Sequence, residues 1–214
     1  MIWAFSLRYG RYAARSPYHL PARSGATLIE GNERFLCGEA RFPTVCKETL
    51  ADLARGQHPY ATILGCSDSR VPPELLFDAN FGELFIVRVA GNVVSAEVMG
   101  SLQYAGSHLH TPLFVVLGHQ GCGAVAAALD TKAHGTEHKP RIQIRVDGIQ
   151  PGLSDPDPHL SPEAQLEKAL EENLRWSIGQ LLATPEGKSA VEGGRATIIG
   201  AVYEIATGKV RFLA

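Results

Sequence analysis

Three short runs of the chain are almost entirely apolar. They read ATILG at residues 61–65, ELFIVRVA at 83–90 and PLFVVLG at 112–118. A strand with one face in water alternates apolar and polar residues, whereas a strand buried on both faces is apolar throughout. The runs therefore predict neighbouring parallel strands of one sheet that helices cover on both faces.

Helical patterns lie between and after these runs. Residues 28–36, 48–56, 95–108 and 123–129 carry apolar positions at helical spacing or open on a helix start. Ser161 and Pro162 predict the N-cap and first position of a longer helix. Its apolar stripe consists of Leu166, Ala169, Leu170, Leu174, Ile178 and Leu181.

The end of the chain completes the predicted sheet. Residues 196–205 read as a further strand, and a TGK turn leads to a short strand at 210–213. Residues 132–158 are rich in Pro, Gly, His and charge and predict a long loop. The expected fold is α/β: one domain over residues 28–214, with a central, mostly parallel β-sheet flanked by helices and a C-terminal hairpin at its edge.

Composition excludes several classes of protein. The 214 residues are 45% hydrophobic and 20% charged with a net charge of −2, which indicates neither a nucleic-acid partner nor a membrane surface. Residues 1–27 contain four arginines and no acid. Such a basic arm is typical of a transit peptide or of a segment that wraps a partner subunit. We expect a cytoplasmic protein, with organellar targeting as the alternative.

The four cysteines, Cys37, Cys46, Cys66 and Cys122, are too few for a disulfide scaffold. They form no CxxC pair, which disfavours both a zinc ribbon and a redox thiol protein. This usage favours a reducing compartment, although one exported disulfide stays open. Any metal site would have to be assembled from distant segments.

Such a site is suggested where two strands end. Cys66 follows the first strand directly, and the third strand ends in GHQGCG, which contains His119 and Cys122. Because ligand sites form beyond the carboxyl ends of parallel strands, we expect these three side chains to converge. Two thiolates and one imidazole leave one tetrahedral position of a zinc ion open, as in catalytic sites. Taken singly, each is equally well read as a core residue.

The pattern CxDxR followed by GHxxCGA resembles the β-class carbonic anhydrases. The segments RVPPELLFD, ELFIVRVAGN, GSLQYA and VLGHQGCGAV are also similar to that family. The resemblance runs from about residue 28 to the C-terminal hairpin and is densest over residues 56–129.

The resemblance implies a zinc lyase, a carbonate dehydratase that holds one Zn²⁺ per chain on Cys66, His119 and Cys122. Its reaction is the reversible hydration of carbon dioxide to bicarbonate and a proton by attack of zinc-bound hydroxide. Asp68 and Arg70 are the implied catalytic residues. Arg70 would keep Asp68 ionised and in place, and Asp68 would orient the hydroxide.

Family members differ in whether this site closes. In the closed form the carboxylate of Asp68 leaves Arg70 and takes the fourth zinc position. Members that close resemble one another in a Trp three residues before the first cysteine, where this chain has Ile63. An arginine at the position of Arg88 occurs in both groups. We therefore expect an open site near neutral pH.

The resemblance also implies a substrate pocket of Gln57, Phe85 and Tyr104, with the backbone N–H of Gly123 near the metal. It implies a homodimer or homotetramer in which Gln57 and Tyr104 reach the zinc site of the partner chain. His108, His110, His134 and His138 are candidate proton shuttles or solvated loop residues.

Two alternatives share the same scaffold. One is a CS2 or COS hydrolase with the same metal site and a different access route. The other is a non-catalytic zinc-binding or bicarbonate-sensing protein, which loss of Asp68, Arg70 or Gln57 would favour. All three residues are present.

Overall fold

A five-stranded sheet forms the centre of the protein in the computed structural model, which describes residues 21–41 and 47–213. The strand order is β2-β1-β3-β4-β5, with β1 to β4 parallel and β5 antiparallel to β4. The strands are β1 Ala61–Gly65, β2 Leu84–Arg88, β3 Leu113–His119, β4 Thr197–Tyr203 and β5 Val210–Phe212. This confirms the predicted mostly parallel sheet and its C-terminal edge hairpin.

Successive side chains of the central strands enter two different cores, because neighbouring residues of a strand point to opposite faces. Leu64 and Val116 pack on one face beneath α5, α6 and α8. Ile63 and Val115 pack on the other face, against α2 and α4. Both faces are covered, which is why the strands carry continuous apolar runs rather than alternating ones.

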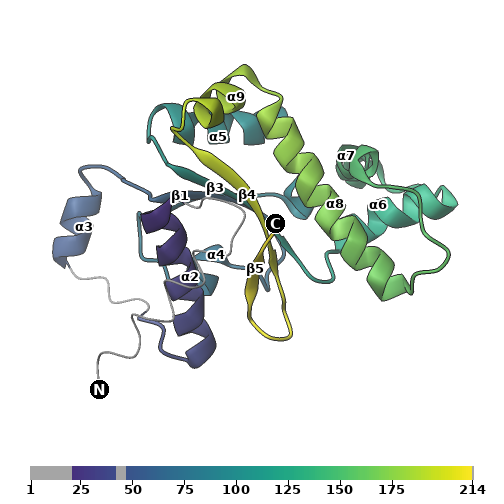
Figure 1. The fold of residues 1–214 in the computed structure, drawn as a ribbon, viewed down its shortest axis with the longest axis horizontal. Coiled ribbons are helices and arrows are strands. Elements are labelled where there is room, and N and C mark those ends of the chain that lie inside the picture. Colours follow the sequence, from purple (N-terminus) through teal and green to yellow (C-terminus); the bar gives the residue numbers. More distant parts are fainter. Residues whose placement is uncertain (1–20, 42–46, 214) are drawn as a thin grey trace.

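Eight described α-helices surround the sheet (Figure 1). Figure 1 shows the long helix α8 alongside β4, with α6 and α7 at one end of the molecule and α3 at the other. The helices are α2 Ala22–Cys37, α3 Lys47–Leu53, α4 Pro73–Leu76, α5 Ala96–Ser107, α6 Gly123–His134, α7 Pro140–Ile149, α8 Pro162–Leu182 and α9 Pro185–Glu192. Two 3₁₀ turns, η1 Ala90–Asn92 and η2 Gln150–Gly152, complete the described elements.

The predicted helix starts are confirmed where a capping side chain marks them. Ser161 Oγ accepts a hydrogen bond from the N–H of Ala164 at 3.2 Å, and Pro162 opens α8. Ser95 caps α5 in the same way, through the N–H of Val98. In each case the hydroxyl satisfies a backbone donor that the first helical turn leaves free.

The prediction of a long loop over residues 132–158 is wrong. The helix that begins at Gly123 continues to His134, and α7 and η2 follow after a short connection. Pro140 stands in the first turn of α7, where a missing N–H costs nothing. Val146 and Ile149 face the core. The other residues of α7 include several charged ones, so these few apolar positions give no recognisable helical pattern in the sequence.

The first described helix is longer than the sequence predicts. Helix α2 begins at Ala22, six residues before the predicted start, and buries Ser24 and Gly25. Most of the basic arm at residues 1–27 lies outside the described residues, so its role stays a prediction. Helices α4 and α9 were not predicted because they are short, with four and eight residues. None of the helices in the described ranges is both long and apolar enough to cross a bilayer.

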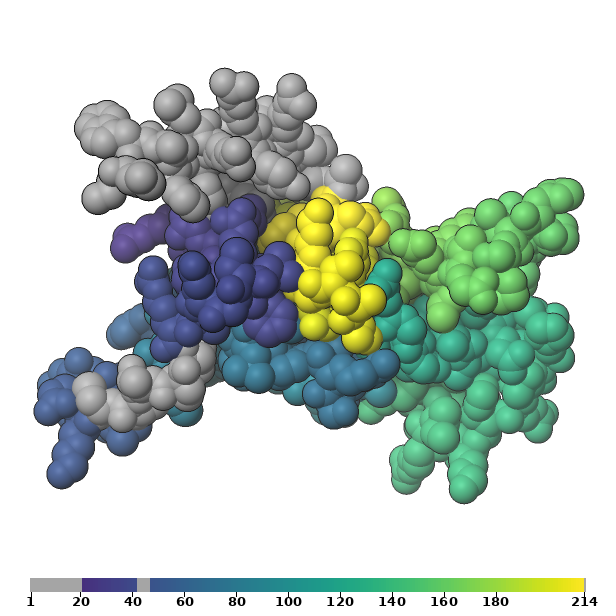
Figure 2. Space-filling view, turned by 90° about the horizontal axis from the view of Figure 1, so that it is seen from below, coloured from purple at the N-terminus to yellow at the C-terminus, as the bar shows by residue number. Residues whose placement is uncertain are grey.

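Asn32 joins the first helix to the last hairpin. Its amide donates to the carbonyls of Leu76 and Gly208, both at 3.0 Å, and its oxygen accepts from the N–H of Val210 at 2.9 Å. Figure 2 shows the C-terminal hairpin, in yellow, lying directly against α2, in purple. One buried amide therefore satisfies three backbone groups from distant parts of the chain.

Replacing Asn32 by Leu should lower the free energy of unfolding by roughly 2–4 kcal/mol, because unpaired buried backbone groups cost about 1–3 kcal/mol each. Urea denaturation followed by circular dichroism measures this loss. The control is Glu33→Ala, an exposed position in the same helix, which should stay within about 0.5 kcal/mol of the parent. Equal stability of the two variants would contradict the role of Asn32.

Candidate metal centre and active site

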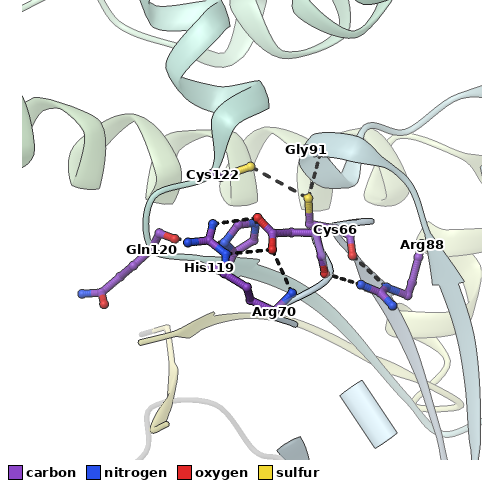
Figure 3. Close-up of polar contacts among 8 residues, drawn as sticks. Cys66, Arg70, Arg88, Gly91, His119, Gln120 and Cys122 are labelled. Carbon is purple, nitrogen blue, oxygen red and sulfur yellow. Dashed lines mark hydrogen bonds and ion pairs between the residues drawn. The ribbon is translucent and has the colours of Figure 1, made fainter. Parts of the chain in front are cut away.

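Three side chains meet at the carboxyl edge of the sheet. Cys66 directly follows β1, His119 ends β3, and Cys122 is the N-cap of α6. Their ligand atoms lie within 4.8 Å of one another, and the two sulfur atoms are 4.0 Å apart (Figure 3). Within residues 21–41 and 47–213 this is the one group of His, Cys, Asp and Glu side chains suited to hold a metal ion. The predicted convergence is therefore found.

His119 presents one ring nitrogen to the two thiols. Nδ1 lies 2.9 Å from the carbonyl oxygen of Gln120, so this nitrogen carries the proton and donates. Nε2 is buried and has no hydrogen-bond partner. A fully buried imidazole nitrogen without a partner is costly unless a ligand completes it. The tautomer set by Gln120 is the one in which Nε2 can bind a metal.

The two thiols differ in acidity because they share a proton in a buried place. A hydrogen bond from Cys122 lowers the pKa of Cys66 to about 4, and the N–H of Gly91 acts in the same direction. The same contact, together with burial, raises the pKa of Cys122 above its ordinary value. The cluster therefore already favours one thiolate, which is the ligand form of cysteine.

Asp68 and Arg70 form an ion pair beside these donors. Arg70 Nε and Nη2 donate to the two carboxylate oxygens at 2.9 and 2.7 Å, and the Arg70 N–H donates to Oδ1 at 2.9 Å. These bonds hold the pKa of Asp68 well below its ordinary value. Asp68 Oδ2 also lies 3.8 Å from His119 Nε2, so the carboxylate faces the three ligand atoms.

Arg88 fixes the loop that carries this pair. Its guanidinium donates to the carbonyl of Cys66 at 2.8 Å and to the carbonyl of Asp68 at 2.5 Å (Figure 3). The sequence singled out Arg88 only as a marker of subtype. Its contacts with backbone carbonyls need the β1–β2 pairing, which places Gly65 beside Arg88.

Of the predicted substrate residues, one lies beside the metal cluster and the other three lie toward the amino end of the sheet. Gly123 is the exposed first residue of α6, next to Cys122. Gln57 is exposed and precedes β1, so the whole strand separates it from Cys66 in the same chain. Phe85 and Tyr104 lie together, with ring centroids 6.1 Å apart, and Tyr104 is 44% exposed. Phe85 pairs with Thr62, toward the amino end of the sheet.

The donor set fits zinc. Two sulfur atoms and one imidazole nitrogen are the ligands that Zn²⁺ prefers, and three protein ligands leave a position for a reactant. The unpartnered Nε2 of His119 is the atom that such an ion would complete. Of the other two cysteines, Cys37 is exposed and apart from the cluster, and Cys46 lies outside the described residues.

Comparison with known proteins agrees with this geometry. A family model described as carbonic anhydrase matches residues 61–210. The fold superimposes on the β-carbonic anhydrase CcaA with a TM-score of 0.72 and 28% identity, over 88% of this chain and 91% of that one. The chain belongs to the β-class carbonic anhydrases. Its activity is accordingly the hydration of carbon dioxide.

Other carbonic anhydrases extend the match over nearly the whole chain. Carbonic anhydrase 2 of Mycobacterium tuberculosis is 37% identical over 191 residues, which cover 88% of this chain and 91% of that protein. The carbonic anhydrase of Mycolicibacterium smegmatis is 35% identical over 201 residues, 91% and 94% of the two chains. A Coccomyxa β-carbonic anhydrase in complex with acetazolamide aligns with a TM-score of 0.69 and 28% identity, over 87% and 84%.

Removing one sulfur ligand should abolish tight zinc binding. We expect Cys122→Ser to lose at least about 100-fold in zinc affinity, more than is typical for a change outside the ligand shell. Competition with a chromophoric chelator measures the affinity. Cys37→Ser, at an exposed thiol outside the cluster, should bind one zinc ion per chain like the parent. Equal binding by the two variants would rule out this site.

Proposed function

We propose that the chain hydrates carbon dioxide with one Zn²⁺ held by Cys66, His119 and Cys122, in a site that is open near neutral pH. The observation that carries the proposal is the buried, unpartnered Nε2 of His119, which faces two thiols at the edge of the sheet. Zinc held by these three residues would supply Lewis-acid chemistry, which lowers the pKa of water toward neutral and so makes it a nucleophile for carbon dioxide.

Asp68 orients the reactants in this proposal. Its carboxylate faces the ligand atoms, and at neutral pH it is ionised and accepts hydrogen bonds only. A water that donates a hydrogen bond to it keeps a lone pair free for attack. Arg70 donates a hydrogen bond to each carboxylate oxygen of Asp68 and so restricts rotation of that side chain.

Two features support the open form. Asp68 accepts three hydrogen bonds from Arg70, so moving the carboxylate to a metal ligand position would break a bidentate charged pair. Ile63, at the position where closing members of the family resemble one another in a Trp, is wholly buried in the core between α2 and the sheet. Its side chain carries no polar group.

We further propose that the enzyme is a homo-oligomer whose substrate pocket is shared between chains. Strand β2 lies at one edge of the sheet, and its side chains Leu84, Phe85, Ile86 and Val87 are only partly buried. An apolar edge strand with unpaired backbone groups favours association. Gln57 and Tyr104 are exposed near the amino ends of the strands, whereas Cys66 lies at the carboxyl ends. They are therefore better placed to reach the metal site of a partner chain than that of their own chain.

The zinc-loaded protein should hydrate carbon dioxide rapidly at pH 7, and stopped-flow measurement from about pH 6.5 to 9 tests this. Asp68 has a lowered pKa, so it stays ionised over this whole range and does not shape the profile. Turnover confined to above about pH 8 would contradict the open site. No turnover with one zinc per chain would favour CS2 or COS as substrate, or a sensor.

Arg70→Met should lower activity at pH 7 by about 10- to 100-fold, a loss typical of removing a group that orients the metal shell. Losing the guanidinium raises the pKa of Asp68 toward its ordinary value, about 3.9. The acid remains ionised at pH 7 but becomes free to approach the metal. Its competition with hydroxide weakens as pH rises, so the activity of this variant should recover at alkaline pH. A uniform loss at all pH values would contradict this role.

Complementation tests the shared pocket. Gln57→Ala should reduce activity about 10-fold, the effect of one lost hydrogen bond, and Cys66→Ser should remove the metal. If Gln57 serves the partner's site, a heterodimer of the two variants has one intact site and about half of the parental activity. Two affinity tags allow the heterodimer to be isolated. Activity no higher than in Gln57→Ala alone would place Gln57 in its own site or in none.

A further inference from the structure

The turn η1 (Ala90–Asn92), just after β2, directs a backbone donor at the metal cluster. The N–H of Gly91 lies 3.4 Å from Cys66 Sγ (Figure 3). Gly91 has φ 69° and ψ 18°, and Asn92 has φ 46°, so two consecutive residues adopt the left-handed conformation. Only Gly adopts this conformation freely, and Asn tolerates it better than most residues.

Packing confines this turn on one side. A Cβ atom at Gly91 would lie 2.6 Å from Ile149 Cδ1 and 2.9 Å from Ala124 Cβ, so α6 and α7 leave no room for a side chain. Helices α6 and α7 therefore limit how far the turn can move on this side.

Helix α8 holds the turn through polar side chains. Asn173 Nδ2 donates to the carbonyl of Gly91 at 3.1 Å. One helical turn later, Ser177 exchanges hydrogen bonds with the side chain and the carbonyl of Asn92, both at 3.4 Å. Asn173 and Ser177 are each 1% exposed, among apolar residues of the core. A buried amide in such a place is costly unless it is hydrogen-bonded, and the one hydrogen bond of the Asn173 side chain is the one to Gly91, since its Oδ1 has no partner among the described residues.

We propose that Asn173 is a positioning residue for the metal centre, which acts by holding Gly91 so that its N–H donates to the sulfur of Cys66. The inference rests on the proposed zinc function and goes beyond it, to a residue 107 positions after Cys66 in the chain. Asn173 contacts neither the three ligands nor the substrate in this account. Its effect passes through one residue, because the carbonyl that Asn173 binds and the N–H that meets Cys66 are the two backbone groups on either side of the Gly91 Cα.

The expected consequence is a change in metal affinity. An N–H donor stabilises a thiolate and restricts its rotation, so loss of the donor leaves the ligand less well placed. Changes in such outer contacts typically reduce metal affinity by about 10- to 100-fold. Asn173→Leu, which removes the amide at similar volume, should show a loss of this size.

A matched control separates this effect from a simple loss of stability. Gln165 is also a buried amide on α8, 7% exposed, but its oxygen accepts from the N–H of Asp157 and it does not contact the turn. Zinc affinity is measured by chelator competition, and folding by circular dichroism. Asn173→Leu should bind zinc about 10- to 100-fold more weakly than the parent. Gln165→Leu should stay within about threefold of it.

The cobalt-loaded and cadmium-loaded forms give a second readout that needs no activity. The thiolate-to-cobalt absorption band should shift in Asn173→Leu and not in Gln165→Leu. In the ¹¹³Cd-loaded parent protein, the amide proton of Gly91 should show scalar coupling to the metal across the N–H···S bond. This measurement uses the unaltered chain, so it holds even if Asn173→Leu fails to fold.

Three results would overturn the proposal. A folded Asn173→Leu with parental zinc affinity would show that the amide serves stability alone, while the metal site itself would stand. The same conclusion follows if the Gly91 proton shows no coupling to cadmium in the parent protein. A parent protein that takes up no metal would overturn the zinc function and this inference together.

Discussion

The site depends on the burial of three side chains able to hold a metal ion, at the point where two parallel strands end. Cys66, His119 and Cys122 are at most 5% exposed, so their polar atoms cannot rely on water. Each must find its partner in the protein or in a bound ion. The surrounding contacts follow from this requirement: Gln120 fixes the imidazole, Gly91 meets one sulfur, and Arg88 holds the loop between the ligands and the acid. The sheet sets where the ligands lie, and these contacts set how they are oriented.

Much of this could be predicted from the sequence, because the strongest signals are local. Continuous apolar runs indicate strands covered on both faces, and ligands placed directly after two such runs must share an edge once the strands are parallel. Ser95 and Ser161 marked helix starts through side chains that cap their own helices. For the same reason the Asp68–Arg70 pair was predictable: the partners are two residues apart, and no other part of the chain is needed to bring them together.

What could not be predicted depends on contacts between distant segments. The helix α7 has an apolar face of few residues within a polar segment, so its pattern is that of a loop until the core beneath it is known. The contacts of Arg88 with the carbonyls of Cys66 and Asp68 need the β1–β2 register. Asn173 lies on the buried side of α8 and, in the sequence, is one polar residue among many. The roles proposed for Gln57 and Tyr104 likewise depend on a second chain, which a single sequence does not describe.

The distance between α8 and β3 has a consequence of its own. A Cβ atom at Gly118 would lie 3.2–3.3 Å from the side-chain carbons of Leu174, so the helix and the strand are in close contact one residue before the ligand His119. Leu174 is also the neighbour of Asn173, which holds the turn beside Cys66. The packing of one leucine thus sets the separation between the strand that carries His119 and the helix that holds the turn beside Cys66.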